Sequence, residues 1–241
     1  MKNKAEIREE IWDQLTEQKL GRFPFPLHGR IPNFKGSEIA AKYVTQLDVY
    51  KEAKVIKVNP DAPQLPLRAQ AIKDGKIVLI PTPRLKAGFI EIRPENVPPG
   101  EERKATSLSN MKKYGQELAL KDLPRVDLFV VGAVAVHQDG SRVGKGEGYA
   151  DREYAILREL GNPEIPIITT VHSIQFIDEP FPADKFDIVS DWVATEKGIY
   201  KVETTRTKPE GIVWERVTEQ ERKDMPVLEE IWAIKEEGKS K

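Results

Sequence analysis

The sequence predicts an α/β protein built around a parallel or mixed β-sheet. Two continuous apolar runs, residues 126–136 (VDLFVVGAVAV) and 165–171 (IPIITTV), have the composition of strands that are buried on both faces. Between them, residues 150–160 (ADREYAILREL) have helical periodicity and end at Gly-Asn-Pro. A strand, a helix and a second strand in this order form a βαβ unit with a right-handed crossover.

The amino-terminal third predicts two helices separated by an extended connection. Residues 3–19 have an apolar arc at helical spacing, opposite an acidic face. The arc contains Ile7, Ile11, Trp12 and Leu15. Residues 22–37 contain three prolines and two glycines, so we expect an extended connection there, and EIAAKYVTQL then predicts a helix. The next predicted elements are strands over 54–58 and 76–81, a loop over 94–100 and a helix over 108–120.

After the βαβ unit, the sequence predicts strands over 186–195 and 211–217. Thr218 and Glu221 have the spacing of a capping box that opens a helix. The apolar face of this helix is formed by Leu228, Ile231 and Trp232. We therefore expect one α/β domain over 1–205 and an extension over 206–241 that packs on it and ends in a charged tail.

Composition excludes several classes of protein. Without cysteine there is no disulfide framework, no thiolate metal site and no cysteine nucleophile. No apolar stretch approaches the roughly 18 residues of a membrane span, and MKNKAEIREE lacks the apolar core of a secretory signal, so we expect a cytoplasmic protein with no membrane partner. The abundance of Glu, Lys and Pro is typical of thermophile proteins.

The charge balance argues against a nucleic-acid partner. The chain has 38 basic and 39 acidic side chains, a net charge of -1, and the only basic hints are KNK near the start and GKSK near the end. Any anion site must therefore be built locally from a few lysines and arginines. The sequence does not predict the oligomeric state.

The segment RVGKGEGYAD, Arg142–Asp151, is the strongest candidate for such a site. It lies between a core strand and a helix, at the expected carboxyl end of the sheet, where ligands of open α/β sheets bind. Its alternate glycines are Gly144, Gly146 and Gly148. They let the backbone approach a phosphate, the helix start presents free N–H groups, and Arg142 and Lys145 add charge. The alternative is a flexible strand-to-helix turn without a ligand.

Two further cations lie on the first predicted helix. Lys4 and Arg8 fall inside its apolar arc, so we expect them to point inward. Cations at a buried edge need a counter-anion, either an internal carboxylate or the phosphates of a ligand. The alternative is that both side chains extend to solvent.

Candidate metal ligands are Asp151, Asp187 and Asp191. Mg²⁺ prefers one or two carboxylates together with phosphate oxygens and waters. Asp151, near a helix start, could instead cap that helix. His137 and His172 end two core strands and could border the same crevice, but two histidines without a third ligand are poor support for zinc. No Gly-x-Ser-x-Gly sequence supports a hydrolase triad.

Taken together, these residues resemble the 5-formyltetrahydrofolate cyclo-ligase family, also called methenyltetrahydrofolate synthetase. Arg142-x-Gly-x-Gly-x-Gly-Tyr-Ala-Asp151 is similar to the family signature Arg-x-Gly-x-Gly-x-Gly-Tyr-Tyr-Asp. Three further segments match in the same order: Lys4-x-x-x-Arg8 in the opening helix, GKIVLIPTPR ending at Arg84, and Gln175 followed by FDIVSDWVATE. The resemblance covers residues 4 to about 196.

The resemblance implies a three-layer sandwich around a mostly parallel sheet, of the type also found in NagB, RpiA and CoA-transferase proteins. It implies ATP- and Mg²⁺-dependent conversion of 5-formyltetrahydrofolate, or a similar reduced folate, to 5,10-methenyltetrahydrofolate. Carried over by position, Arg142 and Lys145 would act in catalysis, Asp151 and Asp187 would hold Mg²⁺, and Tyr149 would lie near the pterin. The ATP-binding set would be Lys4, Arg8, Arg84, Arg142, Gly144, Lys145, Gly146 and Gly148, with Tyr149 beside it.

Two departures from the family pattern leave an alternative function open. Glu147 stands where the family has lysine, and an anion there would repel phosphates. The family's Glu-Val-Asp-Thr-like stretch that contacts folate is replaced by TQLDVYKEAKVIKVNPD. IPNFKGS and GKGEGYAD resemble the branch called methenyltetrahydrofolate synthetase domain-containing proteins. The alternative is a diverged protein that binds a nucleotide or phosphate ligand without cyclo-ligase activity.

Overall fold

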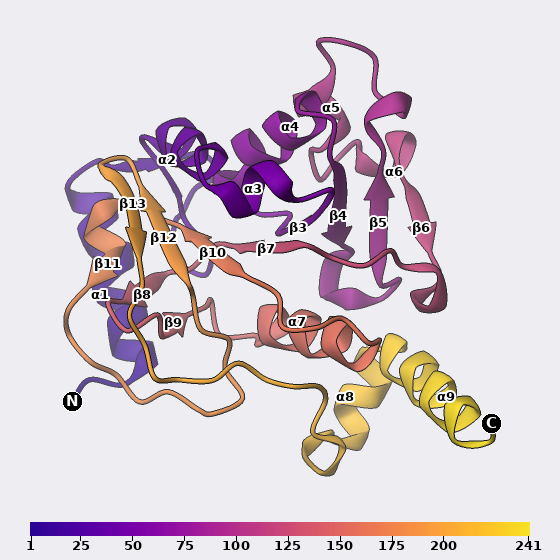
Figure 1. Ribbon diagram of the computed structural model, residues 1–241. Coiled ribbons are helices and arrows are strands. Elements are labelled where there is room, and N and C mark those ends of the chain that lie inside the picture. Colours follow the sequence, from indigo (N-terminus) through magenta and orange to yellow (C-terminus); the bar gives the residue numbers. More distant parts are fainter.

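The computed structural model describes residues 1–241, and its centre is an eight-stranded sheet (Figure 1). Its strands, in spatial order, are β13 (Gly198–Lys201), β12 (Trp192–Thr195), β10 (Ile167–Thr170), β7 (Leu128–Val131), β3 (Val55–Val58), β4 (Ile77–Pro81), β5 (Phe89–Ile92) and β6 (Gln116–Leu118). The five strands from β12 to β4 are parallel, whereas β13, β5 and β6 pair antiparallel with their neighbours. The predicted mostly parallel sheet is confirmed.

Helices cover both faces of this sheet, which gives the three layers. They are α1 (Lys4–Glu17), α2 (Ser37–Thr45), α3 (Asp48–Glu52), α4 (Leu65–Lys73), α5 (Glu102–Ala105), α6 (Met111–Tyr114), α7 (Tyr149–Glu159), α8 (Glu219–Asp224) and α9 (Val227–Lys239). Alternate residues of β7 point to opposite faces of the sheet and into two hydrophobic cores. Leu128 and Val130 pack with α2, α3 and α4, while Phe129 and Val131 pack with α7 and α9. None of the helices combines the length and the apolar composition that crossing a membrane requires.

Helix α1 packs outside the main sheet, against a small second sheet. Its predicted apolar arc is confirmed, because Ile7, Ile11, Trp12 and Leu15 are all buried. Asn3 caps it: the Asn3 side chain accepts from the Glu6 N–H, and the Glu6 carboxylate accepts from the Asn3 N–H. The second sheet consists of β8 (Ala135–His137), β9 (Arg142–Val143) and β11 (Phe176–Ile177), and a two-stranded pair, β1 (Gly21–Arg22) and β2 (Asn33–Phe34), lies in the predicted extended connection.

The apolar run 126–136 is not one strand, as predicted, but two strands in different sheets. The chain leaves β7 at Gly132 and enters β8. A Cβ atom at Gly132 would lie 2.6 Å from Ile31 Cγ2 and 2.8 Å from the amide atoms of Gln64. The glycine therefore permits a close approach between the chain and the β3–α4 connection, and the run breaks there.

The predicted helix over 108–120 is wrong beyond a single turn. Only α6 is helical, and Gly115 ends it before β6 pairs with β5 at the sheet edge. A Cβ at Gly115 would lie 2.5 Å from Ile90 Cγ2, so this turn packs tightly on β5. Helix periodicity could not show that the segment completes the edge of the sheet.

The carboxyl-terminal segment is less regular than predicted. The strand expected over 186–195 is reduced to β12, and residues 211–217 are not a strand. Instead, the Glu159 carboxylate at the end of α7 accepts from the N–H of Ile212 and from the Trp214 indole. The Thr218–Glu221 capping box is confirmed and opens α8, but the apolar face belongs to α9, which starts after Pro226. The domain boundary at residue 205 stays a prediction.

Buried Tyr154 makes stability sensitive to alkaline pH. Its hydroxyl accepts a hydrogen bond from the Ile165 N–H at 3.1 Å, and burial raises the pKa of its phenol to about 12. In the unfolded chain the phenol ionises at about pH 10. The buried neutral phenol therefore contributes fully to stability below that pH, and this contribution is lost as the pH rises toward about 12. We expect urea titrations of Tyr154→Phe to show a flatter decline in unfolding free energy over this range than the parent protein. An equal decline of unfolding free energy with pH in both proteins would contradict the assignment of this pH dependence to Tyr154.

Candidate functional site

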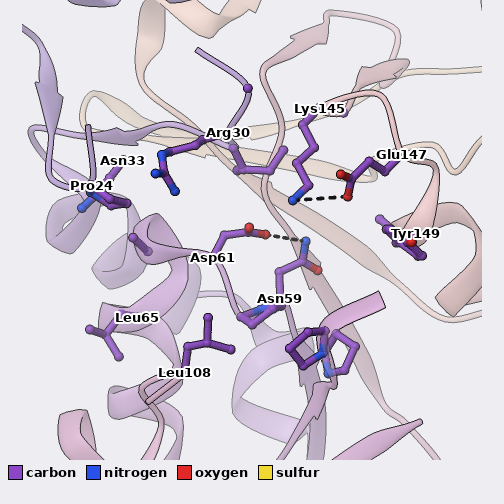
Figure 2. A pocket seen from close by; sticks show the side chains of 18 of the residues that line it. Pro24, Arg30, Asn33, Asn59, Asp61, Leu65, Leu108, Lys145, Glu147 and Tyr149 are labelled. Carbon is purple, nitrogen blue, oxygen red and sulfur yellow. Dashed lines mark hydrogen bonds and ion pairs between the residues drawn. The ribbon is translucent and has the colours of Figure 1, made fainter. Parts of the chain in front are cut away.

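A cavity of about 1150 Å³ lies at the carboxyl ends of the central strands (Figure 2). Asn59 and Asp61 follow β3, and Thr82 and Arg84 follow β4. The chain order in the sheet reverses between β3 and β7, because β4 lies beyond β3 on one side and β10 and β12 lie beyond β7 on the other. Such a switch point is where open α/β sheets bind ligands.

All the residues that the family resemblance assigns to the site line this one cavity. They are Lys4, Arg8, Arg84, Arg142, Gly144, Lys145, Gly146, Gly148, Tyr149, Asp151 and Asp187. They come from α1, from the end of β4, from the glycine segment and from the loop that precedes β12. The structure thus brings together side chains that are up to about 180 positions apart in the sequence, whereas their roles stay predictions.

Arg142 is the most deeply placed cation of the cavity. Only 7% of the residue is exposed, and its Nε donates to the Gly132 carbonyl at 2.7 Å. None of the ion pairs in the structure involves its guanidinium, whose terminal nitrogens lie beside Gly144. A buried cation without a paired carboxylate is costly unless an anion binds it.

Arg8 lies beside the same glycine segment. Its Nε donates to the Gly144 carbonyl at 2.7 Å, and its Cζ lies 3.5 Å from the position of a Cβ at Gly146. Burial, and next the charge of Arg142, lower the pKa of the Arg8 guanidinium. Two neighbouring guanidinium groups repel each other, and a shared phosphate would relieve this repulsion.

The glycine segment leads directly into α7. Gly146 has φ +111° and Gly148, which caps α7, has φ +71°, a left-handed conformation that favours glycine. The first N–H groups of α7 therefore lie next to this turn, an arrangement that suits an anion. Lys145 Nζ lies 3.4 Å from the Glu147 carboxylate, so this lysine has an internal partner within the segment (Figure 2).

Two carboxylates and one lysine form the acidic side of the cavity. Lys4 Nζ pairs with Asp187 Oδ2 at 2.7 Å, and Asp151 Oδ1 accepts from the Ile188 N–H at 2.9 Å. Asp151 therefore holds the neighbouring loop and does not cap its own helix, for which Gly148 is the cap residue. Burial raises the pKa of Asp151, Arg142 opposes this shift, and Asp187 adds to it. Two carboxylates in one enclosed region are a donor set that fits Mg²⁺.

Three other candidates lie outside the cavity and have structural roles. Asp191 pairs with Lys208 Nζ at 2.5 Å and accepts from the Ile167 N–H. His137 contacts the Asp178 carbonyl, and His172 lies 3.5 Å from the Glu196 carboxylate. The expectation that both histidines border one crevice is wrong, because neither lines the cavity and each contacts a neighbouring loop instead.

Sequence reasoning missed the polar floor of the cavity. Buried Lys57 Nζ lies 2.5 Å from Glu153 Oε1 and donates to Asn59 Oδ1 at 2.7 Å. Asn59 Nδ2 in turn donates to Asp61 Oδ2 at 3.1 Å (Figure 2). Burial raises the pKa of the Glu153 carboxyl and lowers that of Lys57. The Arg68 side chain, which is only 2% exposed, holds the backbone of Asn59 and Asp61 in place. It donates to the carbonyls of Asn59, Asp61 and Thr106.

Comparison with known proteins identifies close relatives over nearly the whole chain. The bovine methenyltetrahydrofolate synthase domain-containing protein is 40% identical over 237 residues, which are 95% of this chain and 62% of that protein. The human protein of the same name is 38% identical over 244 residues, covering 98% of this chain and 63% of that protein. The chain thus spans a little over three fifths of the length of these curated relatives.

A solved structure and a family model agree with these relatives. The NMR structure of 5,10-methenyltetrahydrofolate synthetase from Aquifex aeolicus has the same fold, with a TM-score of 0.52 and 20% identity, covering 85% of this chain and 95% of that one. The model of the 5-formyltetrahydrofolate cyclo-ligase family matches residues 1–196. The resemblance predicted from the glycine segment and its three companion segments is therefore confirmed, and the chain belongs to the 5-formyltetrahydrofolate cyclo-ligase family.

Proposed function

We propose that this protein uses Mg-ATP to close the ring of 5-formyltetrahydrofolate, giving 5,10-methenyltetrahydrofolate, ADP and phosphate. The observation that carries the proposal is Arg142, a guanidinium that is 7% exposed, has no ion-pair partner and lines the cavity beside Arg8. Such a pair requires a multiply charged anion, and a triphosphate meets this requirement. Family membership supplies the substrate class.

In the proposed reaction the formyl oxygen attacks the γ-phosphorus of ATP, and the bond from that phosphorus to ADP breaks. The N10 nitrogen then attacks the activated formyl carbon and loses its proton to solvent, and phosphate leaves with the former formyl oxygen. Arg8, Arg142 and Lys145 would neutralise charge on the transferring group, as donors do in phosphoryl transfer generally. Positioning and charge neutralisation are enough, and no covalent enzyme nucleophile is needed.

The remaining site residues have supporting roles in this proposal. Lys4, Arg84 and the amides of Gly144, Gly146 and Gly148 would complete the ATP site, and Tyr149 would lie near the pterin. Asp151 and Asp187 would hold Mg²⁺, which when bound neutralises part of the phosphate charge. The two carboxylates lie in the same enclosed region as Lys4.

A single assay tests this function. Purified protein is mixed with 5-formyltetrahydrofolate and Mg-ATP, and the absorbance of the methenyl product is followed, while ATP binding is measured by calorimetry on the same preparation. We expect product to form in proportion to the protein added. Binding of ATP without product would support the alternative, a nucleotide-binding protein without cyclo-ligase activity.

The Lys145–Glu147 contact is the observation that favours this alternative, because it places an anion in the segment that should bind phosphate. We expect Glu147→Gln to tighten ATP binding by up to about 5-fold, since an exposed ion pair of this kind is worth at most about 1 kcal/mol. Calorimetric titration with ATP checks the result, with Glu117→Gln as a surface control of the same chemistry. Weaker binding in Glu147→Gln would show that Glu147 assists the ligand.

A further inference from the structure

Residues beyond the family-matched region contact the loop that carries Asp187. We propose that Arg206 and Arg216 are positioning residues that hold Asp187 in place for the divalent cation of the bound nucleotide. This inference rests on the proposed function, because it assumes that Asp187 takes part in binding Mg²⁺. It assigns a role to a segment that follows the residues 1–196 matched by the family model.

Asp187 is the last residue of a tight turn, Asp184–Asp187. The Asp187 N–H donates to the Asp184 carbonyl at 3.1 Å, and Asp187 Oδ2 accepts from the Asp184 N–H at 3.0 Å. The Asp184 side chain closes the turn further by accepting from the Phe186 N–H. The orientation of the Asp187 carboxylate is therefore set by the position of Asp184.

On the cavity side this turn makes two polar contacts, and Ile188, which follows it, is buried in the hydrophobic core. Lys4 Nζ pairs with Asp187 Oδ2, and Asp151 Oδ1 accepts from the Ile188 N–H, the residue after the turn. Both contacts use groups that the proposed function assigns to ligand binding. When the ligand engages Lys4 and Asp151, only buried Ile188 and the polar contacts on the outer side are left to hold the turn.

The outer side supplies those contacts from the carboxyl-terminal segment. Arg206 Nη2 donates to the Asp184 carbonyl at 2.8 Å, while its Nη1 donates to Ser141 Oγ. Arg216 reaches the Asp184 carboxylate at 3.3 and 3.4 Å, and its guanidinium lies 4.2 Å from the centre of the Phe186 ring. Both arginines thus bind one residue, Asp184, and neither of them lines the cavity.

The segment that carries both arginines is itself fixed to the domain. The Glu159 carboxylate holds Ile212 N–H and the Trp214 indole, and Arg152 pairs with Glu221 at 2.8 Å. Arg152 and Glu159 belong to α7, which begins at the glycine segment. The same helix therefore positions both the arginine-bearing segment and the proposed phosphate site. Outer contacts of this kind orient metal-binding carboxylates.

The test measures divalent cation binding directly. Mn²⁺ is titrated by electron paramagnetic resonance in the presence of a non-hydrolysable ATP analogue. We expect the double variant Arg206→Ala/Arg216→Ala to bind Mn²⁺ about 10-fold more weakly, the usual loss when an outer partner of a ligand is removed. Affinity for the analogue without divalent cation should be unchanged, and the amides of residues 185–188 should exchange hydrogen faster in the ligand-free variant.

Two controls separate positioning from general stability. Arg222→Ala, which removes an arginine of the same segment that pairs with Glu229 away from the turn, should bind Mn²⁺ like the parent protein. Arg206→Lys/Arg216→Lys should recover part of the affinity, because lysine keeps the charge but not the planar donors. Unchanged Mn²⁺ affinity in the double alanine variant, with faster exchange of the turn, would overturn the inference. Lack of Mn²⁺ binding by the parent protein would overturn the proposed function instead, and this failure needs no substitution to be seen.

Discussion

Glu153→Ala is expected to lower the free energy of unfolding by about 3–5 kcal/mol, the typical loss when one partner of a buried ion pair is removed. Lys57 is fully buried, and Glu153 Oε1 at 2.5 Å is its only charged partner. Without this carboxylate the buried ammonium group must either remain charged with Asn59 Oδ1 and the ring of Phe129 beside it, or lose its proton. Both outcomes disfavour the folded state.

Urea unfolding measures this loss as a lower midpoint at an unchanged slope. The double variant Lys57→Met/Glu153→Met is the matched control, because an apolar pair of similar volume removes both charges together. We expect it to recover most of the stability that Glu153→Ala loses. A double variant that is as unstable as Glu153→Ala would show that packing, and not an uncompensated charge, explains the effect.

Arg142→Ala has the largest expected effect on ligand binding. The guanidinium has two terminal nitrogens free for phosphate, and charged hydrogen bonds contribute about 1.5–3 kcal/mol each. We therefore expect the affinity for ATP to fall by about 3 kcal/mol, or about 100-fold in Kd. Calorimetric titration measures the change, and thermal unfolding of the variant confirms that it folds.

Arg103→Ala is the control for simple loss of positive charge. Arg103 also lines the cavity, but it is exposed and comes from α5 and not from the glycine segment. Charges at an exposed rim are screened by salt, so we expect little change in ATP affinity. Equal losses in both variants would mean that the cavity attracts ATP by its overall field, without direct contact from Arg142.

The order of the main elements could be predicted from sequence because the apolar runs of β7, β10 and their crossover helix are long and periodic. Helix α4 escapes such reasoning, since LPLRAQAIK contains a proline and an arginine, Arg68, that turns inward. Strand β5 escapes it too, because Glu91 interrupts a short run, although it is buried against Arg93. In both cases a charged side chain is buried because it has a polar partner, and the apolar periodicity of the segment does not reveal that partner.

The candidate site was predictable where it is local in sequence and not where it depends on distant pairs. The glycine segment keeps Arg142, Lys145 and Asp151 within ten residues, so spacing alone points to an anion site. Lys57 and Glu153, by contrast, are separated by nearly a hundred positions, and each alone has the composition of a surface residue. Only the packing of α7 on β3 makes them a pair.

Arg68 has a consequence for how a ligand enters. Its three hydrogen bonds join the Asn59–Asp61 connection to Thr106, so one buried side chain ties together two segments beside the cavity. A ligand that enters the cavity therefore meets a wall whose shape is already fixed on this side before binding.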